Sequence, residues 1–180
     1  MRVVVIPGMG CTPTATSNWY GWFQAEMQRR SHECVLRDFP DPYGCKESVW
    51  VPFVLNDIGV DDDTVIVGHS SGAACAMRLL EQNLNLRGAV LVAAAHTDLG
   101  DEAERRSEYF NRPWDWETMK KGARNIVCFH GTDDHLIPVS EARHIAEMME
   151  GDSFEYMEMD GKSHFFRAWQ ELLDVMDQKM

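Results

Sequence analysis

A serine flanked by glycines is the first residue of this chain that could do chemistry. It stands in Gly68-His69-Ser70-Ser71-Gly72, after the apolar run 64–67 and before a run of small residues suited to a helix. In the pattern G-x-S-x-G, a strand turns so sharply into a helix that the serine takes strained backbone angles, which flanking glycines make sterically possible. We therefore predict that Ser70 exposes its hydroxyl as a nucleophile; the alternative is a plain Gly-Ser turn.

A serine hydroxyl is a weak nucleophile, so it needs a base that a carboxylate holds in place. Around a turn of this kind the chain order is serine, then acid, then histidine. Asp133 and Asp134 follow the apolar run 126–129, and His164 follows the alternating run 154–159. Two consecutive strand ends thus supply an acid and an imidazole, and we predict that His164 is the base.

The two aspartates also lie between His130 and His135, a string that a metal ion could use. No second group of histidines at ligand spacing exists elsewhere in the sequence, so we expect neither a metal ion nor another cofactor.

Acyl transfer would also require hydrogen-bond donors for the oxyanion of its intermediate. One is expected to be the backbone N–H of Ser71, which follows the nucleophile, and the other should come from the loop after the first strand. That loop reads Pro7-Gly8-Met9-Gly10-Cys11, and we predict that Met9 donates its amide. An ordinary turn between a strand and a helix is the alternative.

The elements that would position these residues follow an alternating pattern. Six apolar runs, each long enough for a strand, are separated by stretches with helical periodicity, which predicts an α/β protein with a mainly parallel sheet covered on both faces. The predicted strands span residues 3–6, 34–36, 64–67, 89–93, 126–129 and 154–159. The predicted helices span residues 19–30, 48–58 with Pro52 in its first turn, 71–82, 141–150 and 165–176.

Length and charge limit the function classes. The chain has 180 residues, which predicts a single domain over residues 1–180, and its net charge of −12 argues against nucleic acid and anionic membrane surfaces as partners. The first residues lack the pattern of a signal peptide, and the five cysteines are scattered and never spaced as C-x-x-C. We expect a cytoplasmic protein with reduced thiols.

Many further landmarks are shared with one family. The chain resembles the small serine hydrolases typified by retinoblastoma-binding protein nine, a compact branch of the α/β-hydrolase superfamily. The matching residues include Pro7-Gly8, Trp19-Tyr20-Gly21-Trp22, Pro40-Asp41-Pro42, Glu47 to Phe53, Gly68 to Gly72, Asp98 to Glu102, Tyr109 to Trp116, Thr132-Asp133-Asp134 and Gly161 to Phe165.

This resemblance implies a three-layer α/β sandwich with strand order 2-1-3-4-5-6 and a minimal lid or none. It implies a triad of Ser70, Asp134 and His164, and the spacing Gly131-x-x-Asp134-x-x-Ile137-Pro138 is similar to the family's acid loop, which favours Asp134 over Asp133. The implied function is hydrolysis of small carboxylic esters or amides.

One property of that family does not carry over. Its name comes from binding a pocket protein through a Leu-x-Cys-x-Glu segment just before the nucleophile strand. Here that stretch reads Ile58-Gly59-Val60-Asp61-Asp62, without the Leu, the Cys or the Glu. We therefore expect no pocket-protein partner and a small-molecule ester or amide as substrate.

Residues 98–124 are the stretch available for a lid, and they are rich in aromatic residues. We predict that Trp114 and Trp116 wall the pocket and select substrates with an apolar or aromatic acyl part; the alternative is that they only pack this segment onto the body. For the whole chain, the alternative to a serine hydrolase is a binding or scaffold protein that keeps the fold. A dehalogenase-like enzyme would need a carboxylate where Ser70 stands.

Overall fold

The computed structural model describes residues 1–180 and contains one six-stranded sheet. All neighbouring strands are parallel, and their order is β2-β1-β3-β4-β5-β6, as the sequence analysis predicted. The strands are β1 (Arg2–Ile6), β2 (Glu33–Val35), β3 (Thr64–His69), β4 (Gly88–Val92), β5 (Ile126–Gly131) and β6 (Phe154–Met159).

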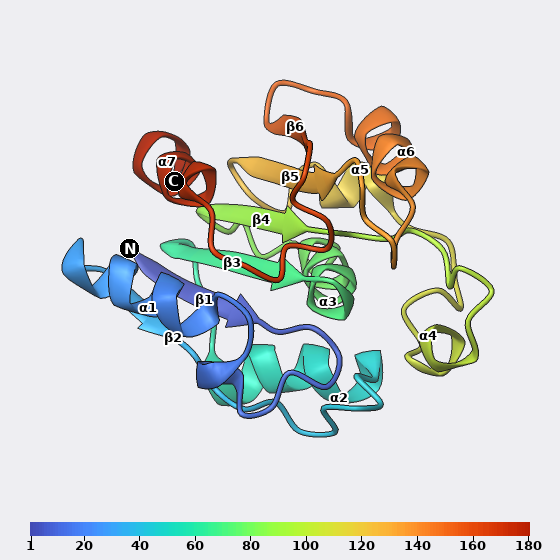
Figure 1. Ribbon diagram of the computed structural model, residues 1–180, viewed down its shortest axis with the longest axis horizontal. Helices are drawn as coiled ribbons and strands as arrows, with labels where there is room; N and C mark the ends of the chain where they lie inside the picture. Colours follow the sequence, from blue (N-terminus) through green and yellow to red (C-terminus); the bar gives the residue numbers. More distant parts are fainter.

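Helices cover both faces of this sheet and make a three-layer sandwich (Figure 1). One face packs against α1 (Tyr20–Arg29) and α7 (Gln170–Lys179), and the other packs against α2 (Glu47–Pro52), α3 (Ser71–Leu80) and α6 (Val139–Met149). The remaining helices are η1 (Thr14–Thr16), η2 (Phe53–Ile58), α4 (Glu102–Arg106) and α5 (Trp116–Met119).

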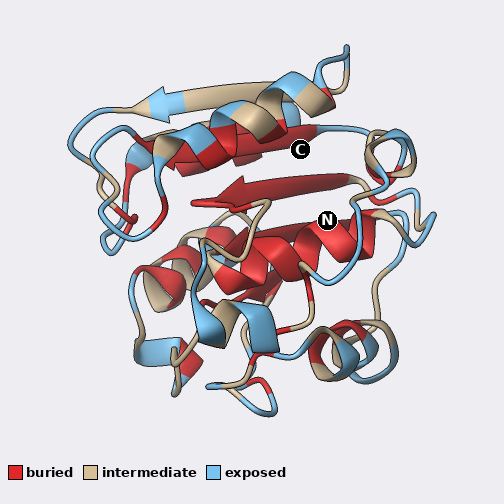
Figure 2. Ribbon diagram, turned by 90° about the vertical axis from the view of Figure 1, so that its right-hand side faces the viewer, coloured by how far each residue is buried: buried red, intermediate tan, exposed pale blue.

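The central strands are mostly apolar, as expected for strands that are buried on both faces, and their few polar residues stand at or near the strand ends. In β1, Val3 and Val5 face α1 and α7, whereas Val4 and Ile6 face the opposite layer. Every residue of α3 is buried, and this part of the molecule is coloured as buried in Figure 2. The small residues in its first half allow α3 to lie close against the sheet.

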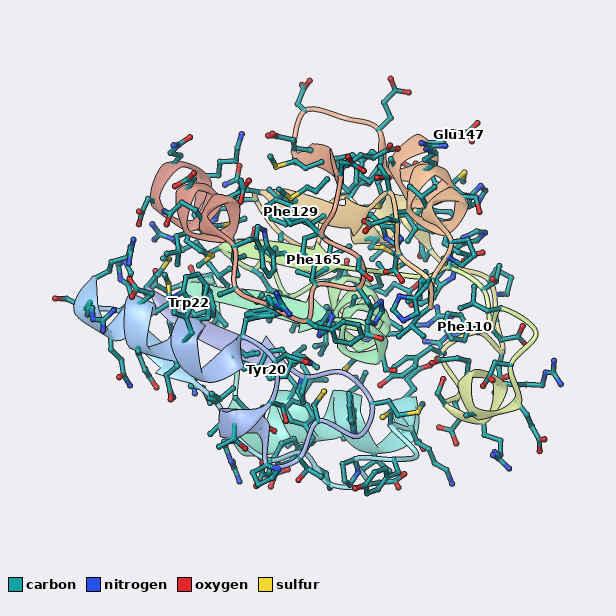
Figure 3. All side chains as sticks on the ribbon, viewed as in Figure 1. Tyr20, Trp22, Phe110, Phe129, Glu147 and Phe165 are labelled. Atoms are coloured by element: carbon teal, nitrogen blue, oxygen red, sulfur yellow. The ribbon has the colours of Figure 1, made fainter.

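Two predicted helices differ from the structure. The last one begins at Gln170 rather than at residue 165, because Phe165 takes a left-handed backbone conformation with φ 53° and its ring packs beside Phe129 (Figure 3). The helix over 48–58 is α-helical only to Pro52 and continues as a π-helix. Proline lacks an N–H for the Ser48 carbonyl, which interrupts the α-helical pattern at that point.

Since all six strands run in one direction, their carboxyl ends meet at one edge of the sheet, on the right in Figure 1. The loops that follow the strands, and the segment that contains α4, lie at this edge. No helix is both long and apolar enough to span a membrane.

Candidate active site

Ser70 occupies a strained turn between β3 and α3. Its backbone has φ 57° and ψ −121°, a conformation outside the regions that side chains normally allow. A Cβ at Gly68 would collide with the Gly72 carbonyl, and a Cβ at Gly72 would collide with the Ile6 carbonyl. Both flanking glycines are therefore required by close backbone packing, as the G-x-S-x-G pattern indicated.

Asp134 follows β5 and makes hydrogen bonds through both carboxylate oxygens. Its Oδ1 accepts from the amides of Leu136 at 2.8 Å and Ile137 at 3.0 Å, and its Oδ2 lies 2.7 Å from His164 Nδ1. Burial alone would raise the pKa of Asp134, but these hydrogen bonds outweigh it and hold the pKa below its usual value. The carboxylate therefore stays ionised at neutral pH and fixes the His164 ring with Nδ1 as the donor.

Asp133 holds the loop that carries the histidine. Its Oδ1 accepts a hydrogen bond of 2.9 Å from the amide of Ser163, the residue before His164. The loops after β5 and β6 also approach closely, since a Cβ at Gly131 would collide with the Ser163 carbonyl. The sequence analysis placed Asp133 beside the acid but did not identify this contact, because nothing in the local pattern links residue 133 to residue 163.

His164 sits between two residues with left-handed backbones, Ser163 at φ 49° and Phe165 at φ 53°. Its side chain is almost fully buried, and its Nε2 makes no hydrogen bond within the protein. Ser70 and His164 line the same cavity. Ser70 Oγ has no hydrogen-bond partner there, and catalytic contacts of this type commonly tighten only when substrate is bound.

A buried chain of hydrogen bonds connects the histidine loop to the loop after β1. His69 Nε2 donates to the His164 carbonyl at 2.9 Å, so its Nδ1 accepts from the Tyr20 hydroxyl at 2.7 Å. The same hydroxyl accepts from the Gly8 amide at 3.0 Å. Burial, helped by the nearby His164, lowers the pKa of His69 to about 3, so this ring stays neutral. The sequence analysis did not foresee this role for His69 or Tyr20.

The amides of Met9 and Ser71 are free to bind an oxyanion. Both residues line the cavity, and neither amide donates a hydrogen bond within the protein. Ser71 is also the first residue of the ten-residue helix α3, whose N-terminal end carries partial positive charge. These are the two amides that the sequence analysis named as oxyanion donors, and that role stays a prediction.

The cavity has a volume of about 540 Å³, a size suited to a small-molecule ligand. Its walls come from the loops after β1, β3, β5 and β6 and from residues 99–104. Asp101 and Glu104 are the acidic residues in the lining, and no lysine or arginine lines it. Burial, followed by the charge of Asp101, raises the pKa of Glu104 above its usual value.

The two tryptophans predicted as pocket walls lie elsewhere, so this part of the prediction needs correction. Trp114 packs over the guanidinium of Arg78 at 3.7 Å and donates through Nε1 to the His96 carbonyl at 2.8 Å. Trp116 lies beside His144, with ring centroids 6.1 Å apart. Neither tryptophan lines the cavity, whereas Phe110, near α4 in Figure 3, lines a small recess that opens beside Ser70.

Arg78 explains why Trp114 turns away from the cavity. It is fully buried on α3, forms an ion pair with Glu81 at 2.8 Å, and donates to the carbonyls of Tyr109 and Arg112. A buried arginine therefore fixes residues 109–114 onto the body of the protein. One signal was present in the sequence: Arg78 is a lone charge in a helix that is otherwise small and apolar up to Leu80.

Comparisons with known proteins identify the family of this chain. Residues 3–177 match the family described as serine hydrolase. The chain is 37% identical over 177 residues to the serine hydrolase RBBP9 of Rattus norvegicus, covering 97% of this chain and 93% of that protein.

Solved structures share the fold at lower identity. The ydeN gene product of B. subtilis superposes with a TM-score of 0.87 at 20% identity, covering 99% of this chain and 97% of that one. Est1E of Butyrivibrio proteoclasticus, with ferulic acid bound, superposes with a TM-score of 0.74 at 11% identity over 99% of this chain and 88% of that one. With the match over residues 3–177 and the RBBP9 relative, these findings establish that the chain belongs to the serine hydrolase family.

Proposed function

We propose that this serine hydrolase cleaves small carboxylic esters or amides through an acyl-enzyme intermediate, with a triad of Ser70, His164 and Asp134. The observation that carries the proposal is the 2.7 Å hydrogen bond between the buried, ionised Asp134 and Nδ1 of His164, a residue that lines the same cavity as Ser70. This arrangement leaves His164 Nε2 free to accept a proton, which is what a general base for the serine requires.

In the first half of the reaction, His164 Nε2 takes the proton of Ser70 as Oγ attacks the carbonyl carbon of the substrate. The negative charge that forms on the carbonyl oxygen is stabilised by the amides of Met9 and Ser71. Asp134 stabilises the protonated ring and holds its orientation. His164 then gives the proton to the departing oxygen or nitrogen, and the acyl group stays on Ser70.

In the second half, a water molecule attacks the acyl-enzyme. His164 takes a proton from this water, the ester bond to Ser70 Oγ breaks, and the proton returns to Oγ as the acid leaves. The cavity volume of about 540 Å³ favours small substrates.

The test uses a fluorophosphonate probe, which reacts covalently with an activated serine. The wild type should be labelled and should hydrolyse an activated ester such as p-nitrophenyl acetate, whereas Ser70→Ala should lose both properties. Ser153→Ala is a matched control, because Ser153 lies just before β6, at the amino-terminal ends of the strands, whereas Ser70 lies at their carboxyl ends. Circular dichroism verifies that each variant folds.

The rival function is a binding or scaffold protein that keeps the hydrolase fold. Equal labelling of the wild type and Ser70→Ala would contradict the proposed nucleophile. A wild type that turns over no ester or amide and instead retains one stoichiometric partner would favour the rival.

A further inference from the structure

Two of the three strongly exposed large apolar side chains lie at the catalytic cavity. Leu136 is 51% exposed and Phe166 is 45% exposed, and both line the cavity. The third, Tyr43, is 72% exposed and does not line it. Single exposed apolar side chains are ordinary on protein surfaces, but exposed apolar side chains that line one cavity are typical of a site for an apolar ligand. We call Leu136 and Phe166 the apolar shelf.

The two shelf residues are carried by the loops that hold the acid and the base. Leu136 follows Asp134 by two positions, and its amide donates to Asp134 Oδ1 at 2.8 Å. Phe166 follows His164 by two positions, and the centroids of their rings lie 5.4 Å apart. The geometry that positions His164 for catalysis therefore also positions the shelf beside it.

The chemistry of the proposed reaction decides which part of a substrate meets this shelf. When the bond from the carbonyl carbon to the leaving oxygen breaks, His164 delivers its proton to that oxygen, which becomes an alcohol. The leaving oxygen must then lie within hydrogen-bond reach of the His164 ring. The carbons attached to it consequently lie against the surface next to His164, where Phe166 and Leu136 are exposed.

We propose that Leu136 and Phe166 form the leaving-group site, and that the preferred substrates are esters whose alcohol part is an apolar alkyl or benzyl group. This inference rests on the proposed function. The charged residues of the cavity support this preference for an apolar alcohol part. Asp101 and Glu104 line the cavity, no lysine or arginine does, and the two carboxylates would repel an anionic leaving group.

The experiment measures kcat/KM for ethyl, butyl and hexyl acetate. The acyl part is constant and these alcohols have similar acidity, so the series isolates contact with the alkyl chain. Full burial of one methylene group should raise kcat/KM roughly fourfold. A shelf that covers only one side of the chain should raise it about twofold per methylene, which is about 16-fold for the four methylenes between ethyl and hexyl acetate. Leu136→Ala and Phe166→Ala should each lower this hexyl-to-ethyl ratio about fourfold, and the double variant should bring it close to 1.

Two controls separate the leaving-group site from a general apolar surface. Tyr43→Ala, which removes the exposed aromatic outside the cavity, should keep the wild-type ratio. The ratio of ethyl hexanoate to ethyl acetate, which extends the acyl part instead, should change little in the shelf variants. Leu136→Ala also keeps the backbone amide that binds Asp134, so its effect reports on the side chain.

A hexyl-to-ethyl ratio near 1 in the wild type, or one that survives in the double variant, would overturn the inference. So would an equal loss of preference in the acyl series. In these cases Ser70-dependent hydrolysis of ethyl acetate would leave the proposed function standing. A wild type that hydrolyses no ester and takes up no fluorophosphonate would overturn the proposed function and the leaving-group site together.

Discussion

Two regions at the same edge of the sheet are held in different ways. The loops that carry Ser70 and His164 are short and strained, with left-handed backbones at Ser70, Ser163 and Phe165. The segment 96–124 is instead fixed by long-range side-chain contacts, mainly through Arg78, and through Glu141, which accepts from the amides of His96 at 2.9 Å and Thr97 at 3.0 Å.

We expect the first region to govern the rate of the reaction and the second to govern the choice of substrate. In the first region, strained turns and hydrogen bonds between the loops, such as those made by Asp133 and His69, fix Ser70, Asp134 and His164 relative to one another. Side-chain anchors fix the segment that walls the cavity, so its residues can change without moving the triad. Substitutions in the first region should therefore affect turnover most, and substitutions in the second should affect stability or substrate preference.

The largest effect is expected for Asp134→Asn. An amide cannot hold the His164 ring with Nδ1 as the donor and cannot stabilise the protonated ring, so kcat should fall by about 10³- to 10⁴-fold. Steady-state kinetics with p-nitrophenyl acetate measure this loss. Thermal unfolding verifies that the variant is folded.

Asp133→Asn is the matched control, because its amide oxygen can still accept from the Ser163 amide. Its loss of kcat should stay below about tenfold, as expected when one neutral hydrogen bond replaces a charged one. An equal loss in both variants would contradict the assignment of Asp134, rather than Asp133, as the acid of the triad.

An intermediate effect is expected for Trp114→Ala, this time on stability. The variant loses the packing over Arg78 and the hydrogen bond to the His96 carbonyl, which should lower the free energy of unfolding by about 2–4 kcal/mol. Urea denaturation measures this change. The preference for acyl chain length should remain as in the wild type.

Phe110→Ala provides the contrast, since its ring lies 6.1 Å from that of Trp114 but lines the recess beside Ser70. Enlarging this recess should raise the ratio of kcat/KM for a long-chain acyl ester to kcat/KM for the acetate ester by about tenfold. If Trp114→Ala changes the acyl preference and Phe110→Ala does not, the assignment of these two aromatics is wrong.

The smallest effect is expected for Glu104→Gln, and it depends on pH. Because the folded protein raises the pKa of Glu104, the folded state holds this proton to higher pH than the unfolded chain does. The free energy of unfolding therefore falls as pH rises from the ordinary pKa of a glutamate, which applies to the unfolded chain, through the raised pKa of Glu104 in the folded protein. Glu104→Gln should melt at a higher temperature than the wild type at pH 7–8, with the difference disappearing near pH 4.

Glu102→Gln tests whether this gain belongs to the half-buried position of Glu104, since Glu102 is exposed on the same helix. It should show no such pH-dependent gain. A constant difference between Glu104→Gln and the wild type across pH 4–8 would contradict the proposed origin of the effect.

Patterns of local sequence predicted much of the architecture. The parallel sheet and its strand order followed from apolar runs and from the family resemblance, and the elbow at Ser70 followed from two glycines that the close backbone packing requires. The sequence also predicted that Asp134 and His164 lie close together, because they follow β5 and β6 and the carboxyl ends of parallel strands lie on the same side of the sheet.

Other features depend on contacts between distant residues. Helical spacing from Phe165 to Trp169 was misleading, because these residues pack as an irregular segment against Phe129. The aromatic residues of the segment 98–124 could not be divided by sequence into cavity walls and packing residues. That division depends on Arg78, which draws Trp114 onto the body while Phe110 faces the recess.

The sequence by itself determined the alternation of strands and helices, the strained turn at Ser70 and the types of side chain that follow each strand. These properties come from hydrophobic periodicity and from glycine, and both act over a few neighbouring residues. Only the tertiary structure decided that Asp133 anchors the His164 loop, that His69 and Tyr20 join two loops, and that Leu136 and Phe166 stand exposed beside the base. Each of these depends on loops that approach one another across the sheet edge, which local sequence patterns do not encode.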